Sequence, residues 1–578
     1  MSTEPQTLSL SNKKWKIKPG IPEHISFNLH SYHKLMQQIL YNRGVINEAE
    51  ASHFLNDYSE LHGPERMKGI PEALDAILSA IDTKKKIVIF GDFDADGITA
   101  TALLYLFLKK CGAEVDKYIP NRFDEGYGLT EYSLNGLMSL KPELVITVDC
   151  GIRSISEIET LKSHGINVIV SDHHQPKQDV PDCISVICPK QIGDQYPFKH
   201  LAGVGIAYKI AKAFCNQFPK FEIDADDYLD LVAIGTIADL APLIDENHTL
   251  TKRGLEIISR SKRPGLCALA EIGRIDLKNI NTQDIGFIIA PRLNAAGRMS
   301  SAEKSFQLLA TDDVEEANVH AHLLNEENKN RQDEVAYLLK DVKSHIEENF
   351  TDDKLITYSA PDLKEGVIGL VASKLCEEYY RPVIIGSERD GYIRASCRSI
   401  PELNITNALD HCANILVRHG GHAMAAGFTV SKDKLKELFR RLQTICIEQL
   451  SGKALDPVIE AESEVSLEDL VTLSLHDLAR LEPTGVENPQ PLFVTRNIII
   501  NSLVQIGSDK SHLRFKVRAG KGFIGAIAFR MGKEIDNLGE ETPVDILYAF
   551  ESNNFNGQSY QQLNIKDIKL TVQDNKIS

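Results

Sequence analysis

The sequence predicts a multidomain α/β protein that ends in a β-barrel, and three observations predict this fold class. Short apolar runs alternate with helical patterns over residues 81–300 and again over residues 351–452. A helical stretch without proline, residues 301–350, separates these parts, and residues 453–578 carry strand-like runs. Strands that alternate with helices indicate a parallel sheet with helices on both faces. At 578 residues the chain is too long for a single hydrophobic core, so several domains are expected.

Residues 1–80 predict an N-terminal helical segment, because apolar residues recur at helical spacing over residues 34–55, interrupted at Arg43 and Gly44. Residues 81–300 predict the first α/β domain. Its strands are expected at three apolar runs, each followed by a polar turn and a helical pattern: residues 87–90, 144–148 and 166–170. Such sheets bind ligands beyond the carboxyl ends of their strands, and acidic residues follow these runs.

Residues 301–350 predict one or two long connecting helices, and residues 351–452 predict a second, smaller α/β domain. Residues 453–578 predict an OB-type barrel, a common platform for single-stranded nucleic acid. The five expected strands are residues 498–506, 513–518, 523–529, 544–550 and 560–568, with a hairpin signal at Asn556-Gly557. Aromatic residues are available there for base stacking, although several must belong to the core: Phe515, Phe529, Tyr548, Phe555 and Tyr560.

Composition leaves the binding partner open. The net charge of −17 argues mildly against nonspecific binding to nucleic acid, because phosphates attract Lys and Arg. A carboxylate cluster that holds cations would supply part of this charge, and a local basic groove is compatible with it. The ten cysteines form no Cys-x-x-Cys pair, which predicts reduced thiols in a cytosolic protein. Residues 1–12 lack the apolar core of a secretory signal, and no stretch approaches the ~20 apolar residues of a membrane span.

The strongest local signal is Gly-Asp-Phe-Asp-Ala-Asp-Gly at residues 91–97, which contains Asp92, Asp94 and Asp96. Three carboxylates at alternate positions repel one another away from bulk water, and a divalent cation such as Mg²⁺ or Mn²⁺ removes that conflict. One alternative is an acidic loop that caps the following helix. A calcium loop is another, but it would need a downstream glutamate and a helix in place of the preceding strand.

Three further segments place polar side chains after apolar runs or in apolar surroundings. Asp149 lies in Val-Asp-Cys-Gly, His173 and His174 in Ser-Asp-His-His, and Asp239 in Gly-Thr-Ile-Ala-Asp. One histidine can ligate metal while the other donates a proton or a hydrogen bond to the leaving oxygen; a surface pair without a role is the alternative. Ligands from separate strand ends can hold two cations about 3.5–4 Å apart, which activate water and clamp a displacement at phosphorus. Together the four segments predict metal-dependent hydrolysis of phosphodiester bonds.

The order of these segments resembles the four motifs of the DHH phosphoesterase superfamily. Further segments are similar to its RecJ family of bacterial single-strand-specific DNA exonucleases, from about Arg43 to the C-terminus. These segments are Ile-Pro-Asn-Arg at 119–122 with Gly-Tyr-Gly at 126–128, Leu-Ala-Gly-Val-Gly at 201–205, Pro-Arg-Leu-Asn-Ala-Ala-Gly-Arg at 291–298, Ser-Cys-Arg-Ser at 396–399, Gly-Gly-His-Ala-Met-Ala-Ala-Gly at 420–427, and Leu-Glu-Pro at 481–483 with Asn-Pro at 488–489. The resemblance implies, in chain order, a DHH catalytic domain, a DHH-associated substrate-binding domain and an OB-fold-like nucleic-acid-binding domain.

The resemblance also implies roles for the matched residues. It implies two divalent cations, Mn²⁺ or Mg²⁺, and five metal ligands: Asp94, Asp96, Asp149, His173 and Asp239. Asp92 and Asp172 support this site, while His174, together with the ligand Asp149, is implied to act in catalysis at the scissile phosphate. The residues implied to bind a terminal 5′-phosphate or the nucleic acid are Arg122, Tyr127, Arg298, Ser396, Arg398 and His422. Guanidinium groups and a hydroxyl suit phosphate oxygens. Tyr127 is expected either to stack on a base or, equally, to pack in the core. His422 is expected either to contact the nucleic-acid backbone or only to shape the cleft.

The function implied by the resemblance is a 5′→3′ exonuclease that degrades single-stranded DNA to 5′-mononucleotides in DNA repair and recombination. It implies a monomer in the bacterial cytoplasm, with a single-strand-binding protein and a RecQ-type helicase as candidate partners. The alternatives are a phosphodiesterase for short oligonucleotides or cyclic dinucleotides and a non-catalytic replication scaffold. The barrel favours a polymer, and the intact motif residues favour catalysis. Family members commonly carry Trp-His just before Gly-Val-Ile-Gly; this chain reads Leu363-Lys364-Glu365 there, a departure that concerns DNA contacts of the second domain.

Overall fold

The computed structural model of the protein describes residues 9–56, 61–349, 354–507, 509–539, 543–555 and 558–571. The chain forms two compact units, one of residues 60–455 and one that joins residues 1–59 to residues 456–578. The predicted α/β class with a C-terminal barrel is confirmed. None of the helices among the described residues has the length and apolar character that crossing a membrane requires.

The larger unit contains a five-stranded parallel sheet of order β3-β2-β4-β5-β6. Its strands are Val115–Tyr118 (β3), Ile87–Phe90 (β2), Leu144–Val148 (β4), Asn167–Ser171 (β5) and Ser185–Ile187 (β6). The predicted runs coincide with β2 and β4, and β5 is shifted by one residue from its predicted run. Every residue of β2 and β4 is buried, as expected for the near-continuous apolar runs of parallel strands that are covered on both faces.

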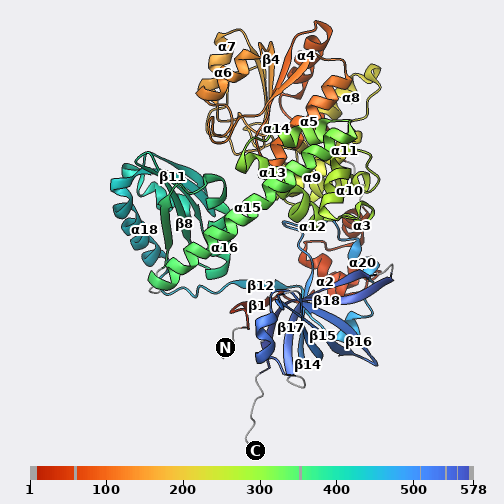
Figure 1. Ribbon diagram of the computed structural model, residues 1–578. Helices are drawn as coiled ribbons and strands as arrows, with labels where there is room; N and C mark the ends of the chain where they lie inside the picture. Colours follow the sequence, from red (N-terminus) through yellow and green to blue (C-terminus); the bar gives the residue numbers. More distant parts are fainter. Residues whose placement is uncertain are drawn as a thin grey trace, which may run out of the picture. The chain divides into compact units, whose positions relative to one another are not determined.

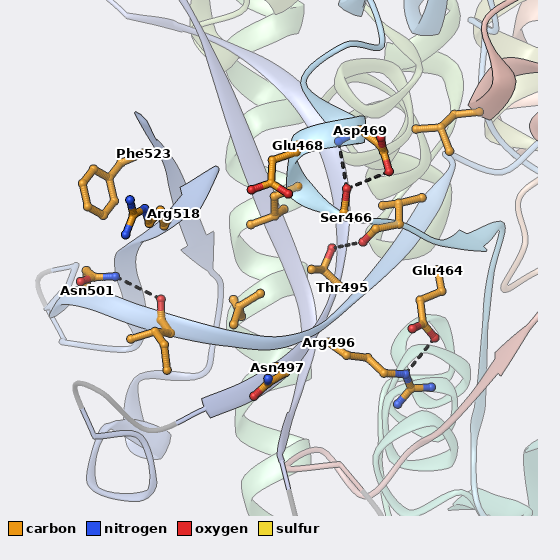
Figure 2. A pocket seen from close by; sticks show the side chains of 15 residues that line it. Glu464, Ser466, Glu468, Asp469, Thr495, Arg496, Asn497, Asn501, Arg518 and Phe523 are labelled. Carbon is orange, nitrogen blue, oxygen red and sulfur yellow. Dashed lines mark hydrogen bonds and ion pairs between the residues drawn. The ribbon is translucent and has the colours of Figure 1, made fainter. Parts of the chain in front are cut away.

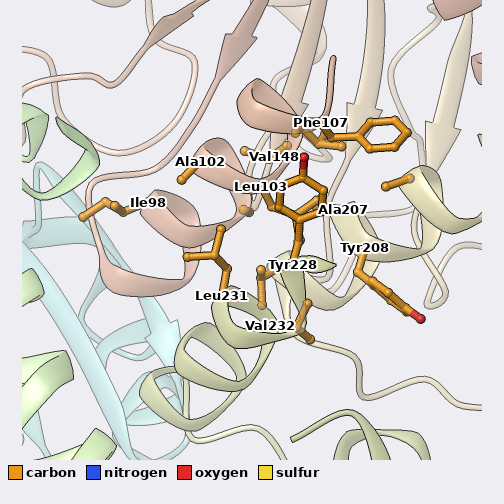
Figure 3. Packing of buried hydrophobic residues seen from close by; sticks show 14 of the residues in the cluster. Ile98, Ala102, Leu103, Phe107, Val148, Ala207, Tyr208, Tyr228, Leu231 and Val232 are labelled. Atoms are coloured by element: carbon orange, nitrogen blue, oxygen red, sulfur yellow. The ribbon is translucent and has the colours of Figure 1, made fainter. Parts of the chain in front are cut away.

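Helices cover both faces of this sheet (Figure 1). Ile87, Ile89 and Ile146 pack against one group of helices, and Figure 3 shows part of that cluster. This group includes α4 (Ile70–Asp82), α5 (Ala95–Lys110), α8 (Gly203–Gln217) and α9 (Leu229–Ala238). Val88 and Val145 face the other way, toward α6 (Glu131–Ser139) and α7 (Ile155–Ser163). Because β2, β4 and β5 run parallel, the loops that follow them lie at the same edge of the sheet.

The predicted connecting segment consists of α14 (Glu303–Ala310) and the long helix α15 (Val314–Asn349). α13 (Ala290–Met299) packs against α15. The buried residues of α15 recur at helical spacing and belong to two different cores. Those in the core of the first sheet are Ala317, Ala321 and Leu324. Those in the core of the second lobe are Val335, Leu338, Val342 and Ile346.

The second lobe of this unit has a mixed sheet of order β10-β11-β9-β8-β7. Its elements are β7 (Ile356–Pro361), α16 (Glu365–Tyr379), β8 (Val383–Arg389), β9 (Tyr392–Arg398), α17 (Ile405–Asp410), β10 (Arg418–His422), β11 (Ala425–Ser431) and α18 (Leu435–Leu450). The antiparallel register puts Arg398, Ala425 and His422 opposite one another across β9, β11 and β10. Directly opposed residues share a face of the sheet, so Arg398 and His422 lie on the same face.

The smaller unit is a barrel whose five strands match the five predicted runs. They are β14 (Leu492–Ile506), β15 (His512–Ala519), β16 (Gly522–Ala528), β17 (Pro543–Phe555) and β18 (Gln558–Leu570), and pairing of β14 with β17 closes the barrel. β17 and β18 pair antiparallel, while the predicted turn residues Asn556 and Gly557 lie outside the described residues. Phe515 and Tyr548 are buried in the core, whereas Phe529 and Tyr560 are each 51% exposed; the side chain of Phe555 is not among those described.

The N-terminal segment packs with this barrel. β1 (Lys14–Ile17) pairs in parallel with β12 (Val458–Ala461). The predicted helical region contains α2 (Lys34–Asn42) and α3 (Glu48–Asn56), which begin and end around the expected interruption. Their apolar residues join the barrel core: Met36, Ile39, Leu40, Ala51 and Leu55. No local pattern in the sequence predicts this long-range packing.

Candidate active site

The predicted metal-site residues gather at the carboxyl edge of the first sheet, although Asp239 comes from the end of helix α9 and not, as predicted, from the end of a strand. They lie close enough for three sets of ligands. In each set, three side chains offer atoms that all lie within 4.8 Å of one another. The sets are Asp92, Asp94 and Asp149; Asp96, His173 and Asp239; and Asp149, His173 and His174. The sets therefore include all five predicted ligands, and they also include Asp92, which was predicted only to support the site.

Backbone N–H groups hold the carboxylates of Asp94 and Asp96. Asp94 precedes α5, and its Oδ1 accepts the N–H groups of Asp96 and Gly97 at 3.0 and 3.1 Å. The capping interpretation of this segment is therefore correct for Asp94, and it leaves the second oxygen free of these bonds. The two oxygens of Asp96 accept N–H groups from Gly203 and Val204, at the start of α8, at 2.6 and 2.9 Å.

Asp149 occupies a position that only a neighbouring glycine makes possible. Its backbone is left-handed, with φ of 60°, and its side chain points against α8. A Cβ atom on Gly203 would lie 2.6 Å from Cβ of Asp149 and 2.8 Å from its Oδ1. Oδ1 of Asp149 lies 3.0 Å from Nε2 of His173, yet it accepts no hydrogen bond, and neither does Oδ1 of Asp92. A buried carboxylate oxygen without a donor is costly, and a cation would satisfy both.

The charges of the cluster are unfavourable in the absence of cations. Burial raises the pKa of Asp92, Asp96 and Asp149 well above the usual range, and the negative charges of neighbouring aspartates raise each pKa further. Burial and the charge of Asp94 raise the pKa of Asp239 to about 7. Within the described chain, no Lys or Arg forms an ion pair with these carboxylates. Oxygen-rich ligand sets of this kind suit Mg²⁺ and Mn²⁺.

The two adjacent histidines have opposite protonation tendencies. Burial lowers the pKa of His173 to about 3, so this imidazole is neutral and has a lone pair for a metal. Burial would also lower the pKa of His174, but the hydrogen bond and the charge of Asp172 outweigh it and raise the pKa. The Nδ1 atom of His174 lies 2.8 Å from Oδ1 of Asp172. Oη of Tyr127 lies 3.3 Å from both ring nitrogens of His174 and donates to the carbonyl oxygen of Asp149.

Four of the predicted phosphate ligands form or adjoin a cluster of guanidinium groups from both lobes. Arg122 lies over the ring of Phe93, 5.0 Å from its centroid. Arg298, on α13, donates to the carbonyl oxygen of Gly366 at 3.3 Å. Arg398 donates from Nη1 to Oγ of Ser396 at 3.0 Å. Burial and the positive charges of Arg122 and Arg331 lower the pKa of Arg298 to about 10.

The ion pairs of the described residues join none of these arginines to a carboxylate, although Asp94 is near enough to raise the pKa of Arg298. Arg331, on α15, belongs to the same cluster but was not predicted from the sequence, since charges on a long helix usually face solvent. Guanidinium groups gathered without carboxylates form a site for an anion.

The remaining predicted residues lie at the borders of these clusters. Tyr127 is 51% exposed, so it is not a packed core residue. Its ring meets those of Phe93 and His174 edge to face. His422 is exposed at the end of the edge strand β10. It shares a sheet face with Arg398, and a role for it in contacting DNA stays a prediction.

Comparison with known proteins agrees with this geometry. Three family models match the chain: the N-terminal domain of the DHH family over residues 86–236, the DHHA1 domain over residues 352–448 and the RecJ OB domain over residues 461–567. The single-stranded-DNA-specific exonuclease RecJ of Bacillus subtilis (strain 168) is 35% identical over 566 residues, which cover 97% of this chain and 71% of that protein.

Solved structures are similar over most of the chain. The crystal structure of RecJ from Thermus thermophilus in complex with Mn²⁺ matches with a TM-score of 0.82 at 28% identity, over 96% of this chain and 80% of that one. The structure of the same protein in complex with Mg²⁺ matches with a TM-score of 0.77 at 26% identity, over 96% of this chain and 78% of that one. The chain therefore belongs to the RecJ family of single-stranded-DNA-specific exonucleases.

Proposed function

We propose that this site hydrolyses the terminal phosphodiester bond of single-stranded DNA with two divalent cations, starts at the 5′ end and releases 5′-mononucleotides. The proposal rests on one observation: the carboxylate cluster and the guanidinium cluster lie next to each other. The N–H of Ala95 donates to Oδ1 of Asn294, on the helix that carries Arg298, at 2.8 Å. Arg122 lies on Phe93, between the first two aspartates of the motif. A terminal phosphate held by arginines therefore reaches the neighbourhood of the carboxylates.

The cation-binding residues that we propose are Asp94, Asp96, Asp149, His173 and Asp239. Bound cations activate water and stabilise charge on the phosphate oxygens. Asp92 has a buried oxygen without a hydrogen bond. It forms a possible ligand set with Asp94 and Asp149, so we add it to the proposed ligands. Asp172 instead accepts N–H groups from Ile152 and His174, which supports a positioning role.

His174 is the proton donor that we propose for the leaving oxygen. Asp172 engages Nδ1 and favours the protonated ring, which leaves Nε2 for the substrate. Tyr127 restrains the ring from another side. A positioned general acid of this kind contributes roughly 10²–10⁴-fold to turnover. Arg122, Arg298, Ser396 and Arg398 receive the terminal phosphate, which carries more negative charge than an internal diester.

For the barrel we propose a role in binding the strand. Arg514, Lys516 and Arg518 alternate with buried residues of β15 and are exposed. The first two line a groove of about 470 Å³ together with Gly525 and Gln562. A basic groove without carboxylates suits a DNA backbone.

A second pocket of the barrel, of about 840 Å³, is a poorer site for DNA (Figure 2). Arg518 and Phe523 border it, but Glu464, Glu468 and Asp469 also line it, and these carboxylates would repel phosphates. We propose the groove and not this pocket as the path of the strand.

We further propose that each domain has the function that the resemblance implies. Residues 81–300 hold the cations, residues 351–452 help to bind the 5′ end and residues 453–578 hold the strand. The same resemblance supports a monomer in the cytoplasm that cooperates with a single-strand-binding protein and a RecQ-type helicase.

The test is incubation with 5′-labelled single-stranded DNA, duplex DNA, RNA and dinucleotides in Mn²⁺, Mg²⁺ or EDTA. We expect mononucleotides from single-stranded DNA only when a cation is present. Preferential cleavage of dinucleotides, or a product other than 5′-mononucleotides, would contradict the proposal. No cleavage of any substrate would indicate a scaffold instead.

A further inference from the structure

The buried residues of α15, which recur at helical spacing from Ala317 to Ile346, form a stripe along the helix. Two neighbouring positions of this buried stripe are polar. Leu324 belongs to the core of the first lobe and Val335 to that of the second. Between them, at the same helical spacing, lie Asn328, which is 3% exposed, and Arg331, which is partly buried. The stripe therefore becomes polar where the helix passes from one lobe to the other.

Contacts on either side of Arg331 show what this part of α15 faces. One turn before it, Glu327 accepts a hydrogen bond from Oγ of Ser300 at 2.7 Å. Ser300 follows Arg298 by two residues. This turn of α15 therefore runs beside the end of α13 that carries Arg298.

The next turn of α15 faces the second lobe. Glu334 forms an ion pair with Lys364 at 2.8 Å. Lys364 precedes Gly366, whose carbonyl oxygen accepts the hydrogen bond from Arg298. Arg331 lies between these two contacts, so its side chain belongs beside Arg298 in the space between the lobes.

Arg331 has no carboxylate partner in the described part of the chain, although two glutamates lie within one turn of it. Glu327 pairs with Lys304 at 2.6 Å and Glu334 with Lys364. Arg331 donates from Nη2 to Oδ1 of Asn328 at 2.9 Å, and its Nε is buried without an acceptor.

Burial lowers the pKa of Arg331, and its charge contributes to the lowered pKa of Arg298. A partly buried cation beside other cations and without an anion is unfavourable. An anionic ligand would satisfy it.

We propose that Arg331, oriented by Asn328, is a further guanidinium of the pocket for the terminal 5′-phosphate and determines the preference for phosphorylated ends. This inference rests on the proposed function. It adds a residue from the connecting helix to a pocket whose other members come from the two lobes, so a single phosphate would contact both lobes and the helix that joins them.

The first test compares hydrolysis of 5′-phosphorylated and 5′-hydroxyl single strands by wild type and two variants. Arg331→Gln removes the charge from the buried stripe. Lys329→Gln removes a charge from an exposed position of the same helix and serves as the matched control. We expect Arg331→Gln to reduce the preference about ten-fold or more, mainly through KM, since hydrogen bonds to charged groups are worth about 1.5–3 kcal/mol. Lys329→Gln should keep the preference.

Arg298→Ala separates failure of this inference from failure of the proposed function. If Arg298→Ala loses the preference and Arg331→Gln keeps it, the pocket stands and the role of Arg331 is overturned. If wild type itself has no preference, the pocket is wrong and the inference fails with it.

A second measurement does not depend on catalysis. Inorganic phosphate should raise the melting temperature of wild type more than that of Arg331→Met, whose apolar side chain retains the length of the stem. In Lys329→Gln, phosphate should raise the melting temperature by as much as in wild type. Equal gains in wild type and Arg331→Met would assign Arg331 a purely structural role and overturn the inference.

Discussion

His174 and Asp172 hold each other through both the ring and the backbone: one oxygen of Asp172, Oδ1, lies 2.8 Å from Nδ1 of His174 and accepts the backbone N–H of the same residue at 3.0 Å. The effect on the two pKa values is opposite. Burial alone would raise the pKa of Asp172, but the hydrogen bond and charge of His174 lower it, while the pKa of His174 is raised. The pair therefore favours a charged carboxylate and a protonated imidazole.

Replacing this carboxylate should shift the pH dependence of the enzyme. In Asp172→Asn, His174 loses the partner that raises its pKa, so it should lose its proton at a lower pH. If protonated His174 is the general acid, the alkaline limb of the kcat profile moves to lower pH. Asp182→Asn, which removes an exposed carboxylate paired with Lys162, is the control and should leave the limb in place. An unchanged limb in Asp172→Asn would exclude His174 as the acid.

Removal of the proposed metal ligands should abolish hydrolysis. Asp94→Ala, Asp149→Ala and Asp239→Ala each remove an oxygen from the sets that can hold a cation, so each should be inactive in a nuclease assay. EDTA should inactivate wild type, and Mn²⁺ or Mg²⁺ should restore it. Full activity of Asp149→Ala in metal-free buffer would contradict the two-cation mechanism.

A calorimetric titration with Mn²⁺ should distinguish the roles of the two histidines. His173→Ala should lose metal affinity, because its neutral ring faces Asp149 and Asp239 at 3.0 and 3.8 Å. His174→Ala should bind Mn²⁺ and DNA but turn over roughly 10²–10⁴-fold more slowly. Loss of a metal equivalent in His174→Ala alone would mean that the two roles are reversed.

The raised pKa of Asp239, about 7 against 3.8 for an ordinary aspartate, predicts a pH-dependent stability of the metal-free protein. The folded chain binds more protons than the unfolded chain between these values, so this group makes stability fall as pH rises from about 4 to about 7. Asp239→Asn removes the effect. Without metal at pH 8, the variant should melt at a higher temperature than wild type, and at pH 4.5 the difference should shrink.

Mn²⁺ provides the control for this prediction. A bound cation stabilises only the folded state and needs the carboxylate of Asp239. At pH 8 with Mn²⁺, wild type should therefore melt at a higher temperature than Asp239→Asn, the reverse of the metal-free order. A metal-free variant that melts below wild type at pH 8 would mean that Asp239 is stabilised by something other than a cation.

Gly203→Ala should damage the site more than the fold. The new Cβ would lie 2.6 Å from Cβ of Asp149, so the carboxylate must move. Displacement of about 1 Å can cost about 10²-fold in rate, whereas overpacking costs about 1–3 kcal/mol of stability. Gly205→Ala, on the same helix, is the matched control, because the three atoms nearest to its Cβ would all belong to the side chain of Leu201, the nearest at 3.3 Å. Equal turnover of the two variants would show that the position of Asp149 is not critical.

The sequence predicts those parts of the fold whose cause is local. β2 and β4 begin and end at the predicted residues because parallel strands that are buried on both faces form short, continuous apolar runs, and a turn signal follows each of them. The barrel strands also have a local cause. A strand with one buried and one exposed face alternates apolar and polar residues, and β15 alternates buried residues such as Phe515 with exposed ones. The pairing of β1 with β12 could not be predicted, because its partners are more than 400 residues apart and either strand alone is short.

The same distinction holds for the site. Carboxylates and histidines at strand ends were predicted because parallel strands bring their carboxyl ends to one edge. The opposite protonation tendencies of His173 and His174 depend on burial and on the reach of Asp172, and neither is visible in two adjacent letters. Arg331 was missed because helical charges usually face solvent. Its one signal in the sequence is its position, together with Asn328, in a row of residues at helical spacing whose other members are apolar.

The arginine cluster should make the enzyme start at a phosphorylated 5′ end. An exonuclease needs a feature that recognises a terminus, and a cluster of arginines from both lobes provides one for a terminal phosphate. A terminal monoester carries more negative charge than an internal diester, so guanidinium groups that lack carboxylate partners discriminate in its favour. Wild type should therefore degrade 5′-phosphorylated single strands faster than 5′-hydroxyl strands.

Arg298→Ala and Arg398→Ala should each shrink this preference through weaker binding. Arg398 is held by Ser373 and Ser396 at 3.0 Å each, away from the carboxylates, so cation affinity measured by calorimetry should stay unchanged in Arg398→Ala. Added salt should reduce the preference of wild type, because the contacts are with phosphate. Lys329→Gln, an exposed charge change, should keep both the preference and its salt dependence. Rapid cleavage of circular single-stranded DNA, or equal rates on the two kinds of 5′ end, would exclude a pocket that recognises the end, because neither substrate comparison would then depend on a terminal phosphate.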